Sequence, residues 1–194
     1  MSSYIATQVF NEMCRDKHVI WNAGAADRIV SLVESLKSFV FEDDIFCDFG
    51  GGDGQAADAW RQKTRCRSIV LDCTPGRLAE AKQRGLEVVE GRLEKLPFAD
   101  ASVQWGMCSH VLEHVESLED ALAELRRVVA CGLLVVVPLE NDEQAKKTVS
   151  HVRHNPSDDW WCNKLSDVGF TIVHRARTAV ELITFITAPD YQPN

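Results

Sequence analysis

Hydrophobic and polar positions change period several times along the chain, and each change predicts a helix or a strand. Short apolar runs typical of buried strands alternate with segments in which apolar residues recur every three or four positions, as in amphipathic helices. The predicted strands are 45–49, 68–72, 86–90, 103–108, 132–138, 170–175 and 181–187. The predicted helices between them are 56–63, 75–84, 118–129 and 160–168.

Two further segments with the apolar spacing of an amphipathic helix precede the first predicted strand. One begins at Ile5 with an apolar residue every four positions, and a second runs over 29–40. We therefore expect an N-terminal helical extension or lid over 1–42, followed by one domain over 43–194.

The alternation of strands and helices predicts the fold class. The nearly continuous apolar run 132–138 is typical of a central parallel strand that is covered on both faces. The loop between the last two strands is so short that it permits only antiparallel pairing. We expect an α/β fold with a Rossmann-like, doubly wound sheet of about seven strands, mostly parallel with an antiparallel C-terminal hairpin and helices on both faces.

Composition narrows the classes of partner. The chain has 194 residues, with 21 Lys and Arg against 29 Asp and Glu, which gives a net charge of −8. This charge repels phosphate backbones and disfavours a nucleic-acid partner. No apolar run is long enough to span a membrane, and the first residues do not have the pattern of a signal peptide. The seven cysteines are scattered without a CxxC pair, so we expect a cytoplasmic protein with no metal site.

A glycine-rich turn is the strongest chemical signal in the sequence. The residues DFGGGDG at 48–54 follow a predicted strand and open a predicted helix. Glycine permits positive φ there and lets a ligand approach the backbone closely, while Asp48 is expected to order the turn. Asp72 ends the next strand, 20 residues after Gly52. A carboxylate at that position accepts hydrogen bonds from ribose hydroxyls.

Two cofactor classes fit this turn. The residues GDGQAA at 52–57 satisfy the GxGxxA form of the dinucleotide fingerprint. The predicted strand ends at Phe49, however, which makes Gly50 the first residue of the turn. The resulting frame is GxGxG, with glycines at 50, 52 and 54.

Several other segments occur in the order known from one enzyme family. They are DCTP at 72–75, GRLEKLPF at 91–98, HVLEH at 110–114 and ALAELRRV at 121–128. Together with the GxGxG turn they make the chain resemble the class I S-adenosylmethionine-dependent methyltransferases, in particular the small, single-domain, type 11-like members. The resemblance covers about residues 45–140.

The resemblance implies S-adenosyl-L-methionine as cofactor, S-adenosyl-L-homocysteine as product, and O- or N-methylation of a small-molecule acceptor. His114 and His110 are the candidate catalytic residues, because an imidazole suits removal of a proton from the acceptor. The residues expected to bind the cofactor are Asp48, Gly50, Gly51, Gly52, Gly54, Asp72, Cys73, Leu93, Glu94 and Cys108.

Three positions depart from the family pattern. Arg92 stands where the family has an acidic residue that reads the adenine amino group, so we assign adenine recognition to the Leu93 backbone and the Glu94 side chain. Gln104 replaces an Asp, which we interpret as a structural change. Cys131-Gly132 replaces a Pro-Gly turn.

Other readings of the same residues stay open. An NAD-dependent oxidoreductase would need a second domain or a Tyr-x-x-x-Lys pair, and neither tyrosine has a lysine four residues on. A zinc hydrolase would use HVLEH at 110–114 as an HxxEH motif. A non-catalytic domain that binds S-adenosylmethionine and acts as a sensor or partner subunit is the third alternative. The segments 15–22 and 151–156 lie outside the core pattern, and similar methyltransferases use such pieces as a lid over the acceptor.

Overall fold

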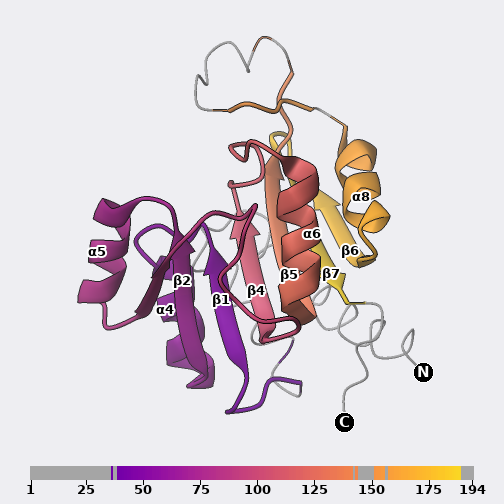
Figure 1. Cartoon of the computed structure of the whole chain (residues 1–194). Coiled ribbons are helices and arrows are strands. Elements are labelled where there is room, and N and C mark those ends of the chain that lie inside the picture. Colours follow the sequence, from indigo (N-terminus) through magenta and orange to yellow (C-terminus); the bar gives the residue numbers. More distant parts are fainter. Residues whose placement is uncertain (1–35, 37–38, 142, 144–150, 156, 189–194) are drawn as a thin grey trace.

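A mixed sheet of seven strands forms the centre of the part of the chain that the computed structural model describes, which is residues 36, 39–141, 143, 151–155 and 157–188 (Figure 1). The strand order is β3-β2-β1-β4-β5-β7-β6. The strands are β1 Ile45–Phe49, β2 Arg67–Asp72, β3 Glu87–Glu90, β4 Val103–Ser109, β5 Val129–Pro138, β6 Thr171–Arg177 and β7 Glu181–Thr187.

The first five strands pair in parallel, in the order β3-β2-β1-β4-β5, and β7 pairs antiparallel with both β5 and β6. The predicted fold class is thereby confirmed, including the antiparallel hairpin at the C-terminal end. The chain moves outward from β1 to β3 and then returns to β4 on the other side of β1. Ligands of such sheets bind outside the carboxyl ends of the strands at this reversal point, between β1 and β4.

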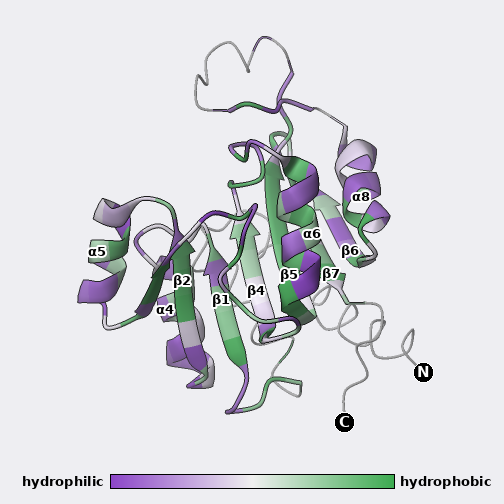
Figure 2. Cartoon of the chain, in the orientation of Figure 1, coloured by the Kyte–Doolittle hydropathy of each residue, from purple (hydrophilic) through white to green (hydrophobic). Residues whose placement is uncertain are grey.

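Helices cover both faces of the sheet. They are α4 Gln55–Thr64, α5 Pro75–Gln83, α6 Leu118–Val128 and α8 Asp158–Asp167. The buried residues of α6 and α8 belong to one hydrophobic cluster, and those of α4 and α5 belong to a second cluster. Figure 2 shows the sheet as largely hydrophobic and the helices as hydrophilic on their outer sides. Each helix therefore buries one apolar stripe against the sheet, as its periodicity predicts.

The start of β5 differs from the prediction. Helix α6 ends at Val128 and β5 begins at Val129, with no turn between them. Cys131 and Gly132 lie inside the strand, so the interpretation of this pair as a turn was wrong. A Cβ atom on Gly132 would lie 2.8 Å from Phe185 Cζ and 2.9 Å from a Trp105 ring atom, which explains why glycine occupies this position.

Gln104 has the structural role that the sequence suggested. Its side-chain Oε1 accepts a hydrogen bond from the backbone N–H of Ile45 at 2.9 Å, at the first residue of β1. The predicted N-terminal helices and most of the extension 1–42 lie outside the described residues. Among the described residues, none of the helices combines the length and apolar character that crossing a membrane requires.

Arg127 at the end of α6 holds the segment after β3 against the helix. Its guanidinium donates to the carbonyls of Leu96 and Phe98 at 3.2 and 2.8 Å, and to the carboxylates of Glu124 and Asp100. Glu124 also accepts from the Leu96 N–H at 2.8 Å. This segment continues from the residues that line the cavity described below, so the arginine fixes the position of that cavity wall.

We expect Arg127→Met to lower the free energy of unfolding by roughly 2 to 3 kcal/mol, because charge-assisted hydrogen bonds to backbone and carboxylate groups are lost while the aliphatic stem is kept. The neighbouring Arg126→Met is the control. Arg126 lies 5.9 Å from the centre of the Phe170 ring, a contact worth about 1 kcal/mol or less at a partly exposed site. Urea unfolding followed by circular dichroism measures both values. Equal destabilisation by the two variants would contradict the anchoring role of Arg127.

Candidate active site

A cavity of about 240 Å³ opens at the carboxyl ends of β1 to β4. Each of these strands is followed by residues that line it. The lining residues are Gly50, Asp72, Cys73, Thr74, Arg77, Gly91, Arg92, Leu93, Glu94, His110, Val111, His114 and Val115. Five of the ten residues that were predicted to bind the cofactor therefore line one cavity.

A second cavity of about 280 Å³ adjoins the first. It is lined by Asp48, Gly50, Gly51, Asp53, Gln55, Ala56, Arg77, Met107, Ser109 and His110. Three residues, Gly50, Arg77 and His110, line both cavities. The two cavities therefore meet at these three residues.

The glycine turn has the conformation that its sequence predicts. Gly50, Gly52 and Gly54 have φ values of 75°, 58° and 81°, which L-amino acids with a side chain rarely adopt. A Cβ atom on Gly50 would lie 2.4 Å from Val111 Cγ2. A Cβ atom on Gly54 would lie 2.5 Å from Leu86 Cδ1, so this glycine serves the packing of α4 rather than the cavity surface.

Asp72 joins the glycine turn to the next helix. One carboxylate oxygen accepts from the Gly52 N–H at 3.0 Å, and the other accepts from the Thr74 N–H at 2.8 Å. Thr74 is the N-cap residue of α5. A carboxylate has about four acceptor sites, so Asp72 keeps capacity for ligand hydroxyl groups on the side that lines the first cavity.

Asp48 lies under the turn and is buried. Burial raises the pKa of its carboxyl group from 3.8 to about 7, although a hydrogen bond from the Ala57 N–H acts in the opposite direction. A Cβ atom on Gly51 would lie 2.4 Å from the Asp48 carboxyl carbon. The absence of a side chain at Gly51 therefore makes room for Asp48 beneath the turn.

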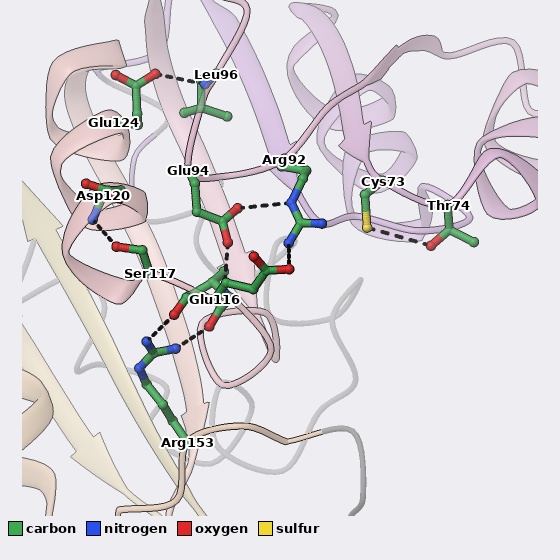
Figure 3. A network of polar contacts seen from close by, with 11 residues as sticks. Cys73, Thr74, Arg92, Glu94, Leu96, Glu116, Ser117, Asp120, Glu124 and Arg153 are labelled. Atoms are coloured by element: carbon green, nitrogen blue, oxygen red, sulfur yellow. Dashed lines mark hydrogen bonds and ion pairs between the residues drawn. The ribbon is translucent and has the colours of Figure 1, made fainter.

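Arg92 cannot accept a hydrogen bond as the acidic residue expected at its position would, and instead it forms an ion pair with Glu94. Figure 3 shows its guanidinium between two carboxylates, 3.6 Å from Glu94 and 2.9 Å from Glu116. Glu94 also accepts from the Glu116 N–H at 2.8 Å. Burial acts to raise the pKa of Glu94, but hydrogen bonds from backbone N–H groups and the charge of Arg92 hold it below its ordinary value. Glu94 is thus an ionised hydrogen-bond acceptor in the cavity wall.

His110 lies at the junction of the two cavities in a strained backbone conformation. Its φ is 55°, a left-handed value that is uncommon for a non-glycine residue and is a feature of functional sites. Its Nε2 lies 2.8 Å from a Glu181 oxygen, and its Nδ1 lies 3.4 Å from a Glu113 oxygen. Glu113 and then Glu181 hold the pKa of His110 above 6.5, against the effect of burial.

His114 lines only the first cavity. Its Nε2 lies 4.0 Å from the Glu113 carboxylate, and its ring meets the His151 ring edge-on with centroids 4.7 Å apart. The two histidines of the sequence motif therefore have different surroundings. His110 faces the cavity junction, and His114 faces the segment 151–155.

Three predicted cofactor residues do not line either cavity. Cys108 is fully buried in the hydrophobic core, because side chains alternate along β4 and its neighbours Met107 and Ser109 take the cavity side. This placement corrects its assignment to the cavity mouth. Gly52 and Gly54 contribute to the conformation of the turn but do not line either cavity.

Two further residues of the site, Arg77 and Glu113, were not predicted from the sequence. Arg77 lines both cavities, and its guanidinium lies where a Cβ atom of Gly52 would be, with Nη2 at 2.2 Å from that position. The sequence could have indicated Arg77 by its position, because it lies two residues after Pro75, in the first turn of the helix that follows the strand ending at Asp72. Glu113 belongs to the HVLEH motif, but the motif does not predict that its side chain is completely buried.

The sheet order, the glycine turn and the carboxylate at the end of β2 define a Rossmann-like protein that binds a nucleoside-containing ligand. Residues 47–137 match the family model described as "Methyltransferase domain". This match confirms the resemblance to the class I S-adenosylmethionine-dependent methyltransferases that the sequence analysis stated.

Comparison with individual proteins agrees with this class. Over 91 residues the chain is 34% identical to malonyl-[acyl-carrier protein] O-methyltransferase of Serratia marcescens, a match that covers 46% of this chain and 35% of the relative. The chain thus matches about a third of the length of that relative.

Solved structures share the fold at low sequence identity. A SAM-dependent methyltransferase of Thermotoga maritima superposes with a TM-score of 0.63 at 17% identity, covering 92% of this chain and 95% of that one. Geranyl diphosphate C-methyltransferase of Streptomyces coelicolor, in complex with S-adenosyl-L-homocysteine, gives a TM-score of 0.67 at 11% identity and covers 80% and 74%.

The raised pKa of Asp48 predicts a pH-dependent penalty on stability. A carboxyl group whose pKa is higher in the folded state costs stability as pH rises from the unfolded value, 3.8, to the folded value, about 7. Asp48→Asn removes this ionisation. Its free energy of unfolding, relative to the unaltered protein, should therefore increase by about 1 kcal/mol between pH 6 and pH 8. Urea titrations at the two pH values measure the change, and a difference independent of pH would contradict the burial of an ionisable carboxyl group here.

Proposed function

We propose that this chain is an S-adenosylmethionine-dependent methyltransferase that methylates an oxygen or nitrogen atom of a small molecule. The observation that carries the proposal is the pair of adjoining cavities, which meet at Gly50, Arg77 and His110. The family match over 47–137 supports the same activity. The described residues fit the cofactor, because Gly50 and Gly51 of the turn line the cavities and Asp72 and Glu94 present carboxylates to the first one.

The nucleoside half of the cofactor fits the first cavity. Asp72 would accept from the ribose hydroxyls, and Glu94 would accept from the adenine amino group in place of the residue that Arg92 replaces. Cys73, whose Sγ lies 4.0 Å from Thr74 Oγ1 (Figure 3), would contact one face of the ring. The Leu93 side chain is buried, which leaves its backbone to contact the base.

The amino-acid half fits the second cavity. Arg77 supplies a positive charge beside the glycine turn, which suits the carboxylate of the methionine portion. Asp53 supplies a carboxylate for its ammonium group. The sulfur atom would then lie between the two cavities, near the residues that line both.

When bound, the cofactor supplies an electrophilic methyl group on a positively charged sulfur. A lone pair of the acceptor forms the new bond to this carbon as the carbon–sulfur bond breaks, and the sulfur keeps the electron pair of that bond. The protein's main contribution is to align the three atoms and to exclude water. An acceptor hydroxyl or protonated amine must also lose a proton.

His110 is the side chain best placed to receive that proton. It lines both cavities, and Glu181 at 2.8 Å stabilises the imidazolium that proton transfer creates. His114 lies farther along the wall of the first cavity. These contacts support His110 as the general base, whereas the sequence analysis put His114 first and His110 second.

A non-catalytic cofactor-binding domain is the second candidate. The observation that favours it is the ion-pair network in which Arg92 joins Glu94 and Glu116 at the adenine end. Binding of S-adenosylmethionine without formation of S-adenosylhomocysteine, on a panel of small hydroxyl, amine and carboxylate acceptors, would support this candidate.

Asp72→Ala should weaken binding of S-adenosylhomocysteine by roughly 1 to 3 kcal/mol, the range expected when hydrogen bonds to a carboxylate are lost. Glu90→Ala is the matched control, because Glu90 pairs with Asp72 in the β2–β3 register but lines neither cavity. Isothermal titration of both variants measures the affinities, with thermal melts to establish folding. Unchanged affinity in folded Asp72→Ala would contradict the assignment, and tight binding of NAD by the unaltered protein would contradict the cofactor class.

His110→Ala should lower turnover of a hydroxyl or amine acceptor by roughly 10²-fold with little change in cofactor affinity. Because the pKa of His110 is raised, the acid limb of the pH profile should lie above pH 6.5 and should be lost in the variant. His114→Ala should have the smaller effect. Turnover is measured as S-adenosylhomocysteine formed, and a normal rate for His110→Ala would remove it from this role.

A further inference from the structure

A second group of ionisable side chains lies behind the cavity wall. Glu113, His114 and His151 each offer a ligand atom, and these atoms lie within 4.8 Å of one another. His151 comes from a segment far along the chain from the other two. Neither the methyl-transfer site nor the family match assigns a shared role to these three residues.

Backbone hydrogen bonds bring the two segments together. The N–H groups of Val152 and Arg153 both donate to the Glu113 carbonyl, at 2.9 and 3.2 Å. The Arg153 guanidinium donates to the carbonyl of Glu116 at 2.8 Å and to that of Val115 (Figure 3). The segment 151–155 is therefore attached to the loop after β4, and this attachment places His151 against His114.

Glu113 is the unusual member of the group. Its side chain is completely buried, and neither carboxylate oxygen has a hydrogen-bond partner within the described part of the chain. The imidazole nitrogens of His110 and His114 approach it only to 3.4 and 4.0 Å. A buried carboxylate without hydrogen bonds is costly, and a coordinated cation is one of the few ways to compensate its charge.

The surroundings of His151 match those of a metal ligand. Its Nδ1 lies 2.7 Å from a Glu140 oxygen, and His154 Nδ1 lies 3.1 Å from the same oxygen. A carboxylate on Nδ1 fixes the ring and leaves Nε2 to face a cation, as in carboxylate–histidine–zinc arrangements.

We propose that Glu113, His114 and His151 bind one divalent transition-metal ion, with Zn²⁺ as the best fit. Two imidazoles and one carboxylate are a known zinc ligand set that leaves a fourth position open, and imidazole ligands disfavour Mg²⁺ and Ca²⁺. Because His114 lines the first cavity, that fourth position would be reachable by water or by an oxygen or nitrogen of a bound molecule.

This site differs from the HxxEH motif read from the sequence. His110, the first histidine of that motif, is paired with Glu181 and is absent from the ligand group. The proposal is also independent of methyl transfer, because the metal is measured without cofactor or acceptor.

The experiment titrates the metal-free protein with Zn²⁺ by calorimetry. One ion per chain should bind, and Glu113→Gln and His151→Ala should each weaken binding at least 100-fold. His174→Ala, in β6 and outside the ligand group, is the matched control and should bind as the unaltered protein does. Zinc at 100 times its dissociation constant should raise the melting temperature by roughly 5 to 10 °C, and this rise should be absent in Glu113→Gln.

Further variants separate this site from its neighbour, the group of Glu140, His151 and His154. Glu140→Gln should weaken binding by roughly 10- to 100-fold, as loss of an outer partner does. Co²⁺ in place of Zn²⁺ should give visible absorption bands of a four- or five-coordinate ion, which Glu113→Gln abolishes. Absence of stoichiometric binding would overturn the proposal. Binding that survives both Glu113→Gln and His151→Ala, or that depends on His154 but not on Glu113, would also overturn it.

Discussion

The carboxylate of Asp72 is the contact on which the cavity geometry depends. It holds the N–H of Gly52 with one oxygen and the N–H of Thr74 with the other, and so fixes the glycine turn to the start of α5. Both segments follow parallel strands of the sheet, β1 and β2. A single buried acceptor therefore orders the two loops that border the cavity and also presents a carboxylate to the ligand.

The other walls are fixed in the same manner, by side chains that bond to the backbone of a neighbouring loop. Arg127 and Glu124 hold the segment after β3, and Arg153 holds the loop after β4. Arg92 joins the same two loops through side chains instead, because its guanidinium pairs with the carboxylates of Glu94 and Glu116. The positive charge that Arg92 brings to this position is thus neutralised by local ion pairs, and the cavity retains an ionised acceptor at Glu94.

Negative charge is concentrated beside the histidines. Glu113, Glu140 and Glu181 each face one or more imidazoles, and Glu113 does so from complete burial. The chain therefore places carboxylates behind its histidines on both sides of the loop after β4. At His110 this arrangement suits proton transfer at the cavity junction. At His114 and His151 it suits a cation, because two imidazoles lie close to a buried carboxylate whose oxygens have no hydrogen-bond partner among the described residues.

The sequence by itself determined the order and type of the described elements, the mixed sheet with its antiparallel end, and the glycine turn followed by Asp72. These features depend on local periodicity and on the conformational freedom of glycine, which short segments encode. Tertiary structure alone decided that β7 lies between β5 and β6, that Cys108 faces the core, that Arg77 covers Gly52 and that His151 meets Glu113. Each of these depends on contacts between segments distant along the chain. Such contacts are selected by packing and by the pairing of buried charges, and they leave no periodic signal in the sequence.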